Sequence, residues 1–275
     1  SSYKDGCVIL FGMRVISWNM KGANGKNPSW SYLEEFQADI ILLQEVYEFP
    51  EDIEDRYAVE YRKAVGRTGK EQHFGTALLV KGEILAEMPL SSELDWVNLE
   101  LNHFRNNLIS YEVQPTGQEP ANVISVYSPY WFIDTERLQG IDVSGVKLDD
   151  NPNVYLTEIL WCALKNAQPK NNERWIVGGD LNSSETFDVK WGARGNKQVM
   201  DRMKDLGFFE CLKGYQGQLT PTFKHSSGNF EDQIDHLFVT NCLATKLTEC
   251  KTGDHSRVFD NSLSDHLPIV ADFKT

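Results

Sequence analysis

Four short polar motifs, each next to an apolar run, carry the residue types from which a metal-dependent phosphoesterase site is built. They are Ser17-Trp18-Asn19, Leu43-Gln44-Glu45, Gly179-Asp180-Leu181-Asn182 and Ser264-Asp265-His266. A hard cation such as Mg²⁺ takes oxygen ligands, typically one or two carboxylates with water and phosphate oxygens completing the shell. The motifs supply such oxygens, so their presence together indicates metal-assisted chemistry on phosphoesters.

The apolar runs beside these motifs are typical of buried strands, because they are short and bounded by turn-forming residues. Strand ends present polar groups to a shared cleft from a rigid scaffold. Three further segments are predicted to be antiparallel strands, with Pro115-Thr116-Gly117 as the turn between the last two. The predicted strands include Val15-Ile16, Ile40 to Leu43, Gly75 to Val80, Asn107 to Val113, Val123 to Tyr127, Trp175 to Val177 and Ile269-Val270.

Three helices are predicted from apolar spacing and end signals. Asn27-Pro28 opens the first, and Asn151-Pro152 starts the second, whose apolar residues recur at core-facing helical spacing from Leu156 to Leu164. The third carries Val199 to Leu206 and stops at Gly207. Hairpins outnumber βαβ units, so we expect two packed β-sheets with helices outside.

With the same motifs in the same order, the chain resembles the endonuclease/exonuclease/phosphatase superfamily, which includes deoxyribonuclease I-like and exonuclease III-like enzymes. Ile234-Asp235-His236, between the last two motifs, belongs to the pattern. The resemblance runs from Met13 to Phe273. It implies an α/β four-layer sandwich, in which two packed, mainly antiparallel sheets are flanked by helices.

The resemblance also implies a Mg²⁺ or Mn²⁺ site. Glu45 matches the principal metal-ligand carboxylate, Asn19 the neighbouring amide, and Asp265 a second metal-contacting acid. A carboxylate at the end of a core strand is unfavourable unless it is paired or bound to metal, which fits Glu45. A salt-bridged structural acid is the alternative for this residue.

Five residues match catalytic positions. Asp180 and Asn182 match the pair that positions the attacking water, although Asp180 alone would also suit a turn cap. His266 matches the histidine of the Ser-Asp-His motif, and Asp235 the acid that orients it. Tyr127 matches a phenol that bonds the phosphate or leaving group, or else is a strand-end aromatic. Whether Asp180 or His266 is the general base stays open.

The sequence departs from the branch that acts on abasic sites, because Gln44-Glu45 is followed by Val46-Tyr47 where that branch has Thr-Lys. We therefore do not expect abasic-site specificity. A Mg²⁺-dependent nuclease acting on DNA or RNA is expected. The alternative is a phosphomonoesterase or phosphodiesterase acting on a small phosphorylated molecule or inositol phosphate.

The charge balance bears on the substrate. Lys and Arg number 27 against 40 Asp and Glu, a formal net charge of −13, which argues against tight, sequence-independent binding of long nucleic acid. Two local basic clusters stand out, and from them Arg62, Lys63, Arg194 and Lys197 are candidate phosphate contacts. Solvated loops are the alternative.

A long irregular segment starts at Tyr130-Trp131-Phe132 and runs to Asn151. Long loops beside a site are often functional, and aromatic rings there can hold a base or another flat leaving group. The rings can equally pack the loop onto the core.

The length suits one domain over residues 13–275, preceded by residues 1–12 as an N-terminal extension or expression remnant, unless Cys7 to Phe11 adds an edge strand. The five cysteines lack a C-x-x-C pair and are odd in number, which favours a reducing, cytoplasmic location. No apolar run has the length of a membrane span. We expect a monomer.

Overall fold

The computed structural model describes residues 12–192 and 194–274. The expectation of an edge strand at Cys7 to Phe11 lies outside the described residues. No helix within the described part of the chain is long and apolar enough to cross a membrane.

Two six-stranded sheets form the centre of the molecule. Sheet A has the order β11-β12-β1-β2-β4-β3 and sheet B the order β5-β6-β7-β8-β10-β9. In sheet A the strands are β11 (Leu247–Thr252), β12 (Ile269–Phe273), β1 (Met13–Ala23), β2 (Ile40–Val46), β4 (Glu71–Val80) and β3 (Ala58–Val65). In sheet B they are β5 (Gly82–Glu87), β6 (Leu108–Pro115), β7 (Ala121–Tyr127), β8 (Trp175–Asp180), β10 (Asp235–Thr240) and β9 (Phe208–Glu210).

The two sheets share one pairing pattern. A parallel pair lies at the centre of each, β1 with β2 in sheet A and β7 with β8 in sheet B, and every other pairing is antiparallel. The carboxyl ends of a parallel pair meet at one edge of a sheet, where an antiparallel neighbour begins. Asp235 at the start of β10 accordingly lies opposite Asp180 at the end of β8.

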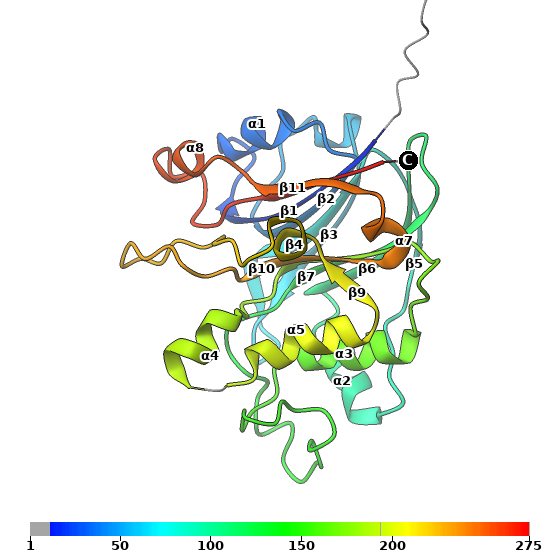
Figure 1. Ribbon diagram of the computed structural model, residues 1–275, viewed down its shortest axis with the longest axis vertical. Helices are drawn as coiled ribbons and strands as arrows, with labels where there is room; N and C mark the ends of the chain where they lie inside the picture. The colour runs from blue at the N-terminus through cyan, green and yellow to red at the C-terminus, as the bar shows by residue number, and fades with distance from the viewer. Residues whose placement is uncertain (1–11, 193, 275) are drawn as a thin grey trace, which may run out of the picture.

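Helices cover both outer faces (Figure 1). They are α1 (Ser29–Glu34), α2 (Asp95–His103), α3 (Leu156–Ala167), α4 (Glu185–Trp191), α5 (Asn196–Asp205), α6 (Cys211–Gln216), α7 (Asn241–Ala244) and α8 (His255–Phe259), with a 3₁₀ turn at Ile53–Asp55. In the view of Figure 1, α1 and α8 lie above the sheets, and α2, α3 and α5 lie below them.

Three apolar layers hold these elements together. Leu42 and Ile176 pack between the two sheets. Trp18 belongs to the layer between sheet A and α1, and Val177 and Ile159 to the layer between sheet B and α3. Alternate residues of each strand point to opposite faces, so the central strands of both sheets are buried on both sides. The predicted four-layer α/β sandwich is confirmed.

The prediction that the second helix starts at Asn151-Pro152 is wrong, because α3 begins at Leu156. The Asn151 side chain accepts a hydrogen bond from the backbone of Asn153, which makes a turn there instead. Glu158 then accepts the backbone N–H of Tyr155 and caps the helix. The other two helices lie where they were expected, at α1 and α5.

The three predicted antiparallel strands do not form one sheet. β6 and β7 form the expected hairpin in sheet B, whereas β4 pairs with β2 and β3 in sheet A. The strand β3 was missed because its charged residues Glu60, Arg62 and Lys63 interrupt the apolar ones and leave a weak alternating pattern.

Gly179 allows strands β7 and β8 to approach each other before the site. Its φ is +151°, and a Cβ there would lie 1.8 Å from the carbonyl oxygen of Val126. No L side chain fits that geometry without moving the backbone.

We expect Gly179→Ala to lower the free energy of unfolding by more than about 2 kcal/mol, because it combines a steric clash with a strained φ. Gly145→Ala is the matched control, since a Cβ at Gly145 meets nothing within 4 Å. Thermal and urea unfolding of both variants measure the difference. Equal stability of the two variants would contradict the close approach described here.

Candidate active site

The polar motifs converge at the edge where the parallel pairs of both sheets end. Asp180 is 1% exposed, and its Oδ2 accepts a hydrogen bond of 3.0 Å from Asn19 Nδ2, so β1 of sheet A is joined to β8 of sheet B. The Asn19 amide also donates to Glu45 at the end of β2. One amide therefore bridges two carboxylates.

Glu45 and Asn182 both adopt a left-handed backbone conformation, with φ of 53° and 47°. Such values are uncommon outside glycine and cluster at functional sites. The turn at Asn182 is held by Asp180, whose Oδ1 accepts the backbone N–H of Asn182 at 2.9 Å. The Asn182 Nδ2 donates to Asp180 Oδ2 and to the carbonyl of Ser128.

His266 and Asp235 form a buried pair. The Nδ1 of His266 lies 2.9 and 3.1 Å from the two carboxylate oxygens of Asp235, which leaves Nε2 for another partner. Trp18 Nε1 donates to the carbonyl of His266, and Ser264 Oγ accepts the His266 backbone N–H. The Thr222 hydroxyl accepts the backbone N–H of Asp235. These contacts fix the orientation of both side chains.

The charges of this cluster shift one another. Burial, together with the charges of Asp235 and Glu45, raises the pKa of Asp180 to about 7. Burial alone would lower the pKa of His266, but the charges of Asp235, Asp180 and Asp265 outweigh it and raise that pKa to about 10. The imidazole is therefore a cation at neutral pH.

Glu45 and Tyr127 form a second contact between the sheets. Burial is the main cause that raises the pKa of Glu45, which accepts hydrogen bonds from Asn19 and Tyr127. Burial and the charges of Glu45 and Asp180 raise the pKa of Tyr127 above its usual range, so the phenol keeps its proton. Tyr127 therefore acts as a donor to Glu45 here.

Two groups of side chains in this cluster are candidates for a metal site, one at Asp180, Asp235 and His266 and the other at Glu45. Among the described residues, ligand atoms of Asp180, Asp235 and His266 all lie within 4.8 Å of one another. Asp235 and His266 are, however, hydrogen-bonded to each other, so a cation there must displace that bond. Glu45 forms no ion pair with another described residue, and its burial raises its pKa, a cost that a divalent ion would offset. The donor set around Glu45 fits a hard cation better.

Asp265 lies at the rim of the cluster. Its Oδ1 is 4.0 Å from His266 Nε2, and its Oδ2 forms an ion pair of 3.1 Å with Lys21. Lys21 was not considered from the sequence, although it follows Asn19 by only two residues. Its ammonium group places a positive charge beside Asp265, one of the carboxylates expected to contact the metal.

The four candidate phosphate contacts do not gather around this cluster. The Arg62 guanidinium is engaged by Glu60, Glu87 and the Tyr111 hydroxyl, and Lys197 pairs with Asp201. Lys63 is exposed on β3. Arg194 lines a cavity next to Asn182.

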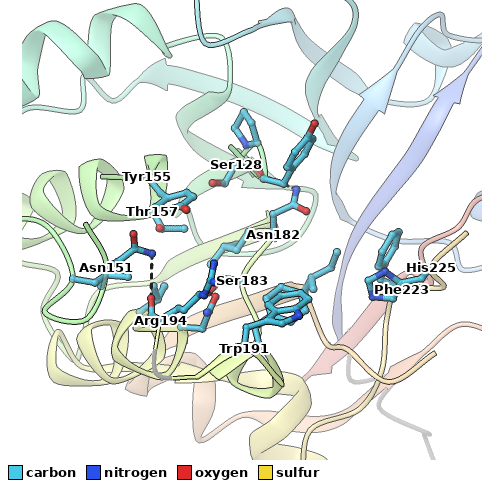
Figure 2. A pocket seen from close by; sticks show the side chains of 18 residues that line it. Ser128, Asn151, Tyr155, Thr157, Asn182, Ser183, Trp191, Arg194, Phe223 and His225 are labelled. Carbon is cyan, nitrogen blue, oxygen red and sulfur yellow. Dashed lines mark hydrogen bonds between the residues drawn. The ribbon is translucent and has the colours of Figure 1, made fainter. Parts of the chain in front are cut away.

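That cavity, of about 420 Å³, opens beside the buried polar cluster on the sheet B side (Figure 2). Asn182 and Ser128 lie on its wall, and so does Phe223, whose ring centroid is 4.8 Å from that of His266. Its other aromatic walls are Tyr130, Tyr155, Phe187 and Trp191. Of the aromatic residues that open the long irregular segment, only Tyr130 lines the cavity, because Trp131 packs on Phe104 and Phe132 on Tyr155.

His225 forms a second histidine–carboxylate pair. Its Nε2 lies 2.8 Å from the buried Asp232, which also accepts from Thr186 and Lys190. His225 lines the cavity and packs on Phe223. Thr186 and Lys190 each lie more than forty residues before Asp232, so no local sequence signal links them to it. His236, which follows Asp235 in the same motif, is buried and bonds the Ser183 carbonyl on the outer face of sheet B.

Comparisons with solved structures agree with this architecture. An AP endonuclease from Archaeoglobus fulgidus has 20% identity and a TM-score of 0.69, covering 96% of this chain and 100% of that one. The 3′ phosphatase NExo from Neisseria, bound to a product DNA hairpin, has 18% identity and a TM-score of 0.65 over 96% and 100% of the chains. The endonuclease domain of TRAS1, a telomere-specific non-LTR retrotransposon, has 17% identity and a TM-score of 0.58 over 96% and 99%.

No curated protein sequence matches this chain significantly. The model of the Endonuclease/Exonuclease/phosphatase family matches residues 16–266, nearly the whole chain. That span contains every motif from Asn19 to His266. The chain therefore belongs to the endonuclease/exonuclease/phosphatase family.

Proposed function

We propose that this protein is a divalent-metal-dependent phosphodiester hydrolase that acts on nucleic acid. The observation that supports this most is the charge of the buried cluster. With Glu45, Asp180, Asp235 and Asp265 ionised, His266 protonated and Lys21 on Asp265, two negative charges remain in excess. A divalent cation and a phosphate oxygen together suit such a site.

In this proposal Glu45 holds the metal, with Asn19 and Asp265 beside it. The ion, Mg²⁺ or Mn²⁺, would supply Lewis-acid stabilisation of the charge that develops on the phosphate. Asn19 also sets the separation of Glu45 from Asp180 through its bridging amide. Tyr127 donates a hydrogen bond at the same place and orients Glu45.

Asp180 and Asn182 orient the attacking water. Asp180 accepts a hydrogen bond from this water. Burial raises the pKa of Asp180 to about 7, within the range of a general base at neutral pH. The Asn182 side chain is held by Ser128 and Asp180, so that the amide has one orientation. Alignment of this kind supplies much of the rate enhancement when a reaction depends on geometry.

His266 acts as a fixed cation in this scheme. Asp235 holds its Nδ1, so Nε2–H is the donor that a non-bridging phosphate oxygen meets. Because its pKa is about 10, His266 is charged before substrate arrives. The general base is therefore assigned to Asp180.

A phosphomonoesterase of the same family is the second candidate. The acidic surface favours it, because net charge of −13 and the pairing of Arg62 and Lys197 with acids leave few cations for a nucleic-acid backbone. The similar structures include an AP endonuclease and a 3′ phosphatase bound to a product DNA hairpin, which supports a nucleic-acid substrate for either chemistry. Oligonucleotides with an internal phosphodiester or a terminal 3′ phosphate separate the two.

We expect Glu45→Gln to reduce hydrolysis by roughly 10² or more, because a metal contributes several kcal/mol to the transition state. Glu48→Gln, an exposed acid three residues away, should change little. Titration calorimetry with Mn²⁺ should show weaker binding for Glu45→Gln alone. Full activity in excess EDTA, or unchanged Mn²⁺ affinity in Glu45→Gln, would refute the metal assignment.

Asp235→Asn should lower the pKa of His266, because it removes the carboxylate charge that holds the imidazolium. The ring resonances of His266, followed by NMR in metal-free buffer between pH 5 and about 11, measure the shift. Asp232→Asn is the control, since Asp232 bonds His225 and not His266. An unchanged His266 titration in Asp235→Asn would exclude the dyad as the source of its charge.

A further inference from the structure

The cavity beside the catalytic residues is built for a flat group attached to the reacting phosphate. Asn182 bonds Asp180 and also lines the cavity, and Phe223 packs on His266 and lines it too. A substituent of a phosphate that accepts from His266 and is attacked by the water at Asp180 therefore reaches the cavity without a spacer. The volume of about 420 Å³ is ample for one nucleoside.

Aromatic rings supply the walls of this cavity. Trp191 and Phe187 of α4 pack on each other with centroids 4.6 Å apart, and Tyr130 and Phe223 belong to other loops. Trp191 is 54% exposed and Tyr130 79%, so both rings keep a face uncovered by the protein. Exposed faces of aromatic rings stack on bases regardless of sequence.

The inner wall is polar, and one group in it lacks a partner. The Ser128 hydroxyl is buried, lines the cavity and forms no hydrogen bond within the described residues. An unsatisfied buried hydroxyl is costly unless something bonds it. This observation is independent of the aromatic walls and points to a ligand that carries polar atoms at its edge.

Two more hydroxyls of the cavity are already committed as donors. Thr157 Oγ1 donates to the buried carboxylate of Glu158 at 2.7 Å, and Ser183 Oγ donates to Asn196 at 2.9 Å. Each has given its only hydrogen, so it meets any further partner as an acceptor. Donors such as an exocyclic amino group match them.

We propose that the cavity binds the base of a nucleotide next to the scissile phosphate, and that it prefers a base with an exocyclic amino group. This inference rests on the proposed nucleic-acid substrate. A base in the cavity cannot remain stacked and paired within a duplex. The substrate is therefore single-stranded nucleic acid, or a frayed end.

The surface charge agrees with recognition of this kind. Lys190 is engaged by Asp232 and Glu231, whereas the Arg194 guanidinium on the cavity wall has no hydrogen bond or ion pair within the described residues. In this mode of recognition, stacking on the base and contacts with its edge supply the affinity, in place of many contacts with backbone phosphates. Affinity should accordingly depend weakly on salt.

The first test uses a single-stranded oligonucleotide with one cleavable phosphodiester, its other linkages being methylphosphonates. A tetrahydrofuran residue replaces the nucleotide on one side of that phosphate, then on the other. Loss of the base on one side should reduce kcat/KM roughly tenfold or more. The double variant Phe187→Leu, Trp191→Leu should lose activity only toward the substrate that carries the base.

Tyr215→Leu is the matched control, because Tyr215 is 47% exposed on α6 and does not line the cavity. Equal cleavage with and without the base on both sides would overturn the proposal. Faster cleavage of duplex than of single strand would also overturn it. So would equal losses on both substrates in the double variant.

A second test is independent of catalysis, so that it separates this inference from the proposed function. Calorimetry with Mg²⁺ should give tighter binding of adenosine 5′-monophosphate than of ribose 5-phosphate, and a smaller gain for uridine 5′-monophosphate. Thr157→Val should reduce the preference for adenine over uracil, with thermal unfolding used to confirm that the variant is folded at the temperature of the titration. Equal affinity for the nucleotide and the sugar phosphate, or no binding of either, would refute the cavity's role even if the enzyme hydrolyses phosphodiesters.

Discussion

Repulsion between carboxylates buried at one edge of two sheets is the constraint on which this structure depends. Asp180 and Asp235 lie directly opposite each other on β8 and β10, away from water. Buried charge is costly unless donors and cations surround it. Asn19 and His266 supply part of that compensation from sheet A. The two sheets are therefore joined at this edge by polar contacts, and elsewhere by an apolar interface.

The repeated pairing pattern explains why the polar groups meet. In each sheet a helix connects the two central parallel strands, so both carboxyl ends point to the same edge. Glu45 ends β2 and Asp180 ends β8. The left-handed backbone conformation of Glu45 and Asn182 turns the chain out of the strand direction, while each side chain stays in the site. Backbone strain at these two residues accompanies their positions in the site.

Much of the fold followed from apolar runs, because the central strands are buried on both faces and each contains a short apolar run. The motif residues from Asn19 to His266 came together for the same reason, since each lies beside such a run. What the sequence did not reveal depends on contacts between distant segments. Lys190 bonds Asp232 across forty-two residues, and Arg62 is neutralised by an acid on another strand. The helix start at Asn151 failed because an Asx-type turn competes with a helix cap.

The central claim is that the divalent cation belongs at Glu45 and that His266 and Asp235 remain a hydrogen-bonded pair. A crystal soaked in Mn²⁺, with anomalous data collected near the manganese edge, tests this most directly. We expect an anomalous peak within coordination distance of a Glu45 carboxylate oxygen, at roughly 2.0 to 2.3 Å, with the Asp235 to His266 Nδ1 contact intact. A peak coordinated by Asp235 and His266, with none at Glu45, would contradict it.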